Sequence, residues 1–169
     1  MKWVSLVPLL ILVLSGCSFD PSFGYTSAEV WEDSRTVAVP VFENQTLEPG
    51  LGVQLTDAVI RELNTRTPWA VTRAGVAQTR LAGTITNVQR QNLSTGRDTG
   101  LVSEQAIVVT MDFRLTDLTS GEVIAARRGL SAAGTFVPDR GAGERTEVGR
   151  RAAVQSLARS LVDELREGW

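Results

Sequence analysis

The sequence predicts an α+β domain: a two-layer sandwich in which a mixed four- to five-stranded sheet carries two helices packed on one face. Three observations support this fold class. Apolar residues recur every four positions over 51–63, apolar and polar residues alternate over 103–118, and helical spacing returns over 154–165. The expected order is strand, helix, short strand, three longer strands and helix, with no internal repeat.

The first strand is expected at Thr36–Phe42, where the valines at 37, 39 and 41 share a face. Pro40 cannot donate to a ladder, so this strand ends there, bulges there or lies at a sheet edge. A turn is expected at Glu43–Thr46. A helix follows through Leu51, Leu55, Val59 and Leu63, ending before Pro68, with a short strand at 69–73.

The second half is expected to form a meander. A strand at 81–92 loses its phase at Val88, which indicates a bulge or the end of the strand, and 93–99 has the composition of a loop. The clearest strand is 103–118, followed by a hairpin turn at 117–121 and a return strand at 122–132. A Gly-rich loop at 138–143 precedes a closing helix that starts at Glu144.

The first residues have the features of a lipoprotein signal peptide. Lys2 precedes an apolar stretch, Trp3–Leu14, which as a helix would reach roughly 18 Å and is too short for a permanent membrane span. Small residues then lead to Cys17, the only cysteine in the chain. The expected organisation is a signal peptide at 1–16, a lipidated N-terminus and tether at 17–34, and the α+β domain at 35–169.

Cys17 is therefore the predicted lipidation site. A mature lipoprotein of this kind carries three acyl chains, and because two chains already hold a protein stably, the anchoring to the membrane should be effectively permanent. With its one thiol acylated, the domain has no disulfide and depends on its core for stability.

The charge balance argues against nucleic acid as a partner. The whole chain has a formal net charge of −2, and loss of Lys2 with the signal peptide leaves −3. Every basic residue of the mature chain is an arginine, a bias that a GC-rich genome would also produce.

No constellation of catalytic residues is visible. The chain contains no histidine, which excludes Ser-His-Asp and Cys-His nucleophilic sites and the commonest zinc sites. The nearest carboxylate pairs lie in a turn or on a solvated helix face, and no glycine cluster has the spacing of a phosphate-binding loop. We therefore expect no catalytic site, no metal and no cofactor.

Arginine is the one residue type that could hold a ligand specifically, because its planar fork binds phosphate bidentately. Arg90 at a strand end, Arg97 in the next loop, and Arg127 with Arg128 on the last strand could lie near each other at one end of the sheet. The alternative interpretation is that these side chains are solvated surface arginines.

The mature chain resembles the LptE family of lipopolysaccharide-assembly lipoproteins. The resemblance lies in Thr36–Leu51, which reads TVAVPVFENQTLEPGL, continuing through Gln54–Leu63, which reads QLTDAVIREL. It lies also in Leu81–Val88, which reads LAGTITNV. With the lipobox and the closing helix, it covers nearly the whole mature chain. The absence of lysine from the mature chain means that any basic contact of the family transfers here only to arginine.

The resemblance implies a non-enzymatic outer-membrane lipoprotein that sits in an LptD-type β-barrel, supports its assembly and presents lipopolysaccharide to it. Its domain would lie on the periplasmic side or inside the barrel, and Ser18 after the lipidated cysteine agrees with sorting to the outer membrane. The opening strand also resembles the periplasmic lipoproteins of curli secretion and the activators of penicillin-binding proteins, which remain the alternative.

Overall fold

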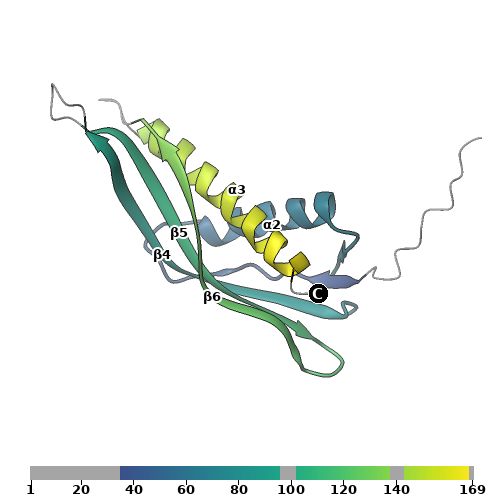
Figure 1. The fold of residues 1–169 in the computed structure, drawn as a ribbon. Coiled ribbons are helices and arrows are strands. Elements are labelled where there is room, and N and C mark those ends of the chain that lie inside the picture. Colours follow the sequence, from purple (N-terminus) through teal and green to yellow (C-terminus); the bar gives the residue numbers. More distant parts are fainter. Residues whose placement is uncertain (1–34, 96–101, 138–142, 168–169) are drawn as a thin grey trace, which may run out of the picture. The chain divides into compact units, whose positions relative to one another are not determined.

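The computed structural model describes residues 35–95, 102–137 and 143–167. Figure 1 shows the arrangement of the helices and strands. In chain order these elements are β1 (Thr36–Ala38), β2 (Glu43–Asn44), α2 (Leu51–Arg66), β3 (Ala70–Val71), β4 (Thr79–Thr95), β5 (Val102–Asp117), β6 (Val123–Phe136) and α3 (Gly143–Glu167). The predicted signal peptide, Cys17 and the tether lie outside the described residues.

The strands form one mixed sheet in the order β3-β1-β4-β5-β6, with the two-residue β2 also pairing with β4. β4, β5 and β6 are antiparallel neighbours, whereas β1 runs parallel to β3 and β4. Both helices lie on the same side of these strands in Figure 1. The predicted α+β class, with two helices on one face of a mixed sheet, is confirmed.

Alternation along β5 determines which sheet face is buried. Its odd-numbered residues from Ile107 to Leu115 are all at most 5% exposed, and they belong to one core with Leu157 and Leu161 of α3 and Leu55 of α2. Because side chains alternate across a strand, the even-numbered residues of β5 lie on the other face. We call that second face, which none of the described helices covers, the open face.

Three strand boundaries differ from those that the sequence predicts. β1 ends at Ala38, two residues before Pro40. It is not an edge strand, because β3 and β4 pair with it on either side. β4 does not end near Val88: a register shift between Ile85 and Asn87 absorbs the loss of phase as a bulge, and the strand continues to Thr95. Pairing with β5 likewise extends β6 to Phe136, beyond the predicted end at 132.

The segment predicted as a turn at 43–46 contains a strand. Glu43 and Asn44 pair in parallel with Thr84 and Ile85 of β4. The backbone N–H of Gln45 donates to the backbone carbonyl of Ile85 at 3.0 Å. Two residues carry no periodicity, so the sequence offers no signal for this strand. Its effect is to hold the segment after β1 against the middle of β4.

The hairpin between β5 and β6 follows its sequence signal. Asp117 accepts the backbone N–H groups of Thr119 and Ser120 at 2.7 and 3.0 Å, and Gly121 takes the positive φ of 75° that closes the turn. These two backbone hydrogen bonds lower the pKa of the Asp117 carboxyl below its ordinary value, and the bond from Ser120 has the larger effect. The predicted turn is confirmed.

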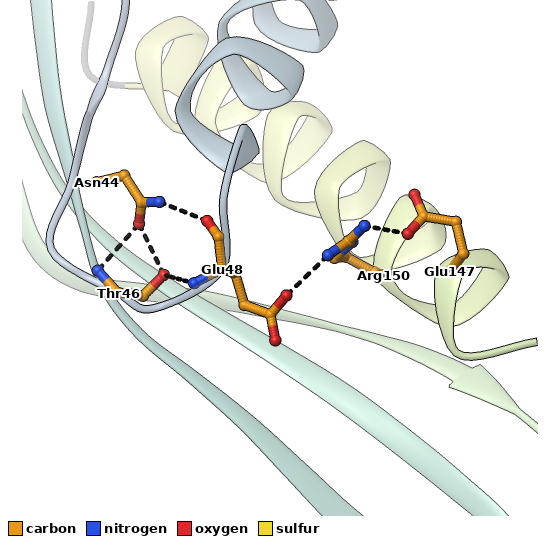
Figure 2. A network of polar contacts seen from close by, with 5 residues as sticks. All are labelled: Asn44, Thr46, Glu48, Glu147 and Arg150. Atoms are coloured by element: carbon orange, nitrogen blue, oxygen red, sulfur yellow. Dashed lines mark hydrogen bonds and ion pairs between the residues drawn. The ribbon is translucent and has the colours of Figure 1, made fainter. Parts of the chain in front are cut away.

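A polar network fixes the loop between β2 and α2 (Figure 2). Asn44 donates to the Glu48 carbonyl at 2.7 Å and accepts the backbone N–H of Thr46 at 3.0 Å. Arg150 of α3 then binds the Glu48 carboxylate at 2.7 Å and the Glu147 carboxylate beside it. With its side chain only 21% exposed, Arg150 links the loop to the helix.

We predict that the Glu48–Arg150 pair contributes a measurable coupling to stability, because Arg150 is partly shielded from solvent. A double-mutant cycle with Glu48→Gln and Arg150→Met, read by urea unfolding, should give a coupling free energy of about 0.5–1 kcal/mol. A coupling indistinguishable from zero would show that the pair does not hold the loop.

Helix α3 lies very close to the sheet at Gly134 of β6. A Cβ built on Gly134 would collide with the carbonyl oxygen of Gly149 and the amide nitrogen of Ala153, both in the backbone of α3. Neither backbone atom can move without displacing the helix. Gly134 therefore sets the distance between α3 and the sheet.

The Gly134→Ala variant should lose about 1–3 kcal/mol of unfolding free energy, the usual cost of overpacking a tight contact. The matched control is Gly75→Ala, where a Cβ meets nothing within 4 Å. Equilibrium unfolding in urea checks both. Equal stability of the two variants would contradict the close packing of α3 on β6.

Candidate functional site on the open face of the sheet

A concave feature of the described residues lies on the open face. It is a hollow of about 750 Å³ that crosses β4, β5 and β6 and is bordered by the segment after β1. We call it the hollow. Its lining residues are Pro40, Val41, Glu43, Gln45, Arg80, Ala82, Gly83, Thr84, Thr86, Asp112, Phe113, Arg114, Val123, Ala126, Arg127 and Arg128.

The border of the hollow is the segment that the polar network restrains. Pro40 and Val41 precede β2, Glu43 begins it, and Gln45 follows it with its amide bonded to β4. Phe42, between these residues, is buried and donates its backbone N–H to the Thr56 hydroxyl of α2 at 2.9 Å. The wall of the hollow is thus tied to the sheet and to both helices.

Charged side chains of both signs line the hollow. The Asp112 carboxylate accepts the backbone N–H of Gly129 at 2.8 Å, and the Glu43 carboxylate accepts the Thr84 hydroxyl at 3.3 Å. Arg80, Arg114 and Arg128 are exposed on three adjacent strands. Sequence reasoning missed Arg80 and Arg114, although the period of two had already placed Arg114 on the wetter face of its strand.

The structure does not gather the four predicted arginines at one end of the sheet. Arg90 is in register with Ile107 and Arg127 with Phe113, so six positions of β5, about 20 Å, separate them. Arg127 is also turned toward the helices, where it forms an ion pair with Glu164 of α3. Of the predicted set, Arg127 and Arg128 line the hollow, and Arg97 lies outside the described residues.

The described residues offer little sign of other chemistry. Among them, no group of three or more Asp, Glu, Cys or His side chains could hold a metal ion. Neither of the helices in the described ranges is long and apolar enough to cross a membrane.

Solved structures with the same fold come from several bacteria. Rare lipoprotein B from Shewanella oneidensis is 14% identical with a TM-score of 0.53, and 79% of this chain and 95% of that chain are covered. A protein from Xanthomonas campestris is 16% identical with a TM-score of 0.59, covering 76% and 82%. The PelC dodecamer from Paraburkholderia phytofirmans is 20% identical with a TM-score of 0.52, covering 78% and 88%.

At these identities the solved structures establish a shared fold only. No curated protein matches the chain. The family model described as LptE, lipopolysaccharide-assembly, matches residues 34–167, which is nearly the whole of the predicted domain and includes every described helix and strand. The chain belongs to the LptE family of lipopolysaccharide-assembly lipoproteins.

Proposed function

We propose that this protein is a non-enzymatic, lipid-anchored component of the outer membrane that partners an LptD-type β-barrel in the transport and assembly of lipopolysaccharide. The observation that carries the proposal is the match of the lipopolysaccharide-assembly family over residues 34–167. Within that family the chain's role would be to bind and to position, because it has no histidine and its one cysteine is the proposed lipid anchor.

The surface of the domain supports a role in binding a large partner. The helices cover one sheet face, while the open face and the outer edge of β6, a strand of 14 residues, are left without a neighbour among the described elements. A strand edge presents unpaired backbone N–H and C=O groups. Such an edge is suited to contact the wall of another β-protein.

The proposed anchor is Cys17, at the end of the signal peptide. Acylation there would hold the domain at the periplasmic surface of the outer membrane through a tether of residues 17–34. The tether would keep the domain close to a barrel in the same membrane, which raises its effective concentration there.

The arginines predicted from sequence remain proposed contacts for lipopolysaccharide phosphates. The spacing of about 20 Å along β5 means that Arg90 and Arg127 would meet different parts of a ligand. Arg127 would have to exchange its ion pair with Glu164 for a phosphate.

The proposed function is tested by depleting the protein in its native host and measuring the fraction of lipopolysaccharide exposed at the cell surface. We expect this fraction to fall while the barrel and other outer-membrane proteins remain present early in depletion. Complementation with the wild-type gene should restore it, and Cys17→Ser should not, because the unacylated protein is not held at the membrane.

Two outcomes would count against this account. Unchanged surface lipopolysaccharide after depletion would overturn the assembly function. Full rescue by Cys17→Ser, or a mature protein whose mass shows no acyl groups on Cys17, would overturn the lipid anchor while leaving the function in place.

A further inference from the structure

We propose that a groove between α2 and α3 binds an extended, acidic segment of another polypeptide, through Arg61 of α2 and Arg151 and Arg159 of α3. The groove is made by the helices and shares no lining residue with the hollow of the open face. The inference goes beyond the proposed function and does not depend on it.

The groove consists of two hollows that join. Each has a volume of about 270 Å³, and Ala58, Arg61 and Gln155 line both of them. All the lining residues belong to the two helices, so the hollows form one groove that follows the helix pair. The other lining residues are Gln54, Asp57, Glu62, Glu147, Arg151, Val154 and Arg159.

The residue types along the two helices give the groove an apolar floor and polar rims. Ala58 and Val154 are buried, and the short side chain of Ala58 leaves room between the helices. Longer polar side chains surround these two residues. Those that are exposed are Gln54, Asp57, Arg61, Arg151, Gln155 and Arg159.

The three groove arginines form no ion pair with any described residue. In this they differ from Arg66 and Arg150, which bind carboxylates of α3 and of the loop before α2. Arg159 donates through Nε to the backbone carbonyl of Gln155 at 3.4 Å, which leaves its charge without a counter-ion. The fold therefore gains no ion pair from these three residues.

The carboxylates of the groove do not cancel this positive charge. Glu62 lies 3.8 Å from Arg66 of the same helix. Glu147 forms an ion pair with Arg150 within α3. Asp57 is the remaining carboxylate, so three arginines without an ion pair share the groove with one such carboxylate in the described part of the chain. This local excess of positive charge, in a chain of formal net charge −2, is complementary to an acidic partner.

The spacing of the arginines indicates the conformation of the ligand. Arg151 and Arg159 are eight residues apart on one helix, or about 12 Å along its axis. Arg61 lies between them on the opposite wall, because it lines both hollows together with Gln155, which is four residues from each. In an extended chain every second side chain lies on one face, and four residues span about 13 Å. Carboxylates at three alternate positions can therefore each meet one arginine.

An extended polypeptide suits the groove better than a helix or a lipid surface does. A helix with its side chains is about 10–12 Å across, which is too wide for hollows of about 270 Å³ each. A membrane surface is bound by exposed apolar side chains beside basic ones, whereas the apolar lining residues Ala58 and Val154 are buried. The amides of Gln54 and Gln155 can both donate to and accept from a peptide backbone.

The test uses the full-length, membrane-extracted protein in neutral detergent and measures the binding of fluorescent synthetic peptides by anisotropy. The probe peptide carries three glutamates at alternate positions, separated by serines. One control peptide has glutamine in place of each glutamate, and a second has the three glutamates next to one another. The test variant is Arg61→Gln. The matched control is Arg166→Gln, which removes the same charge from an exposed residue of α3 outside the groove.

We expect the probe peptide to bind the wild-type protein at low salt, and to bind more weakly as the salt concentration rises, because exposed charges are screened. Arg61→Gln should weaken this binding about threefold to tenfold, whereas Arg166→Gln should change it less than about twofold. The glutamine peptide should not bind, and the peptide with adjacent glutamates should bind less tightly than the probe. Arg151→Gln provides a second variant on the other wall, so that a folding defect in one does not decide the outcome.

The site is overturned if the probe peptide does not bind at low salt, or if Arg61→Gln and Arg166→Gln weaken its binding equally, because the effect would then be one of net charge. It is also overturned if vesicles of anionic phospholipid, and not the probe peptide, bind in a way that depends on Arg61. Equal affinity for the two arrangements of glutamate would contradict the extended conformation of the ligand. None of these results alters the surface lipopolysaccharide measured after depletion, so the two failures are distinguishable.

Discussion

The burial of one sheet face beneath two helices is the constraint on which the rest of the structure depends. Val109 and Met111 of β5 are fully buried in the same core as Leu157 and Leu161 of α3, and Gly134 lets that helix lie close to β6. Because the apolar residues of these strands face the helices, their polar residues lie on the other sheet face. The open face is thus a consequence of how the core is made.

The arginines near the two sheet faces differ in their ion-pair partners. On the helix side, Arg66 and Arg127 pair with Asp163 and Glu164 of α3, and such partly exposed pairs each contribute modestly to stability. On the open face, Arg114 and its neighbours have no such partner in the described residues. Arg80, Arg114 and Arg128 line one hollow, whereas Arg61 and Arg151, which also form no ion pair in the described residues, lie on the helices.

The fold class could be predicted from the sequence because the period of the apolar residues reports both the type of element and its buried face. The period of two in 103–118 and the four-residue repeat through Leu51 and Leu63 each report one buried face. Strand ends could not be predicted as well, since β4 continues past its bulge by pairing with β5. The two residues of β2 are too short to carry any pattern.

The candidate site was harder to predict, because it depends on pairing register rather than on any one strand. Sequence alone grouped Arg90 with Arg127, which the register separates, and overlooked Arg80, which the register places diagonally from Arg114. A shift of one residue in either pairing would move these side chains to the opposite face. Only the assembled sheet shows which arginines are neighbours.

The proposed partnership with an outer-membrane barrel is tested most directly by affinity purification through the native lipoprotein. Extraction in mild detergent, followed by identification of the bound proteins, should recover a large LptD-type β-barrel in roughly equal amount. Recovery of a peptidoglycan synthase, or of the lipoprotein only as a homo-oligomer, would contradict the account.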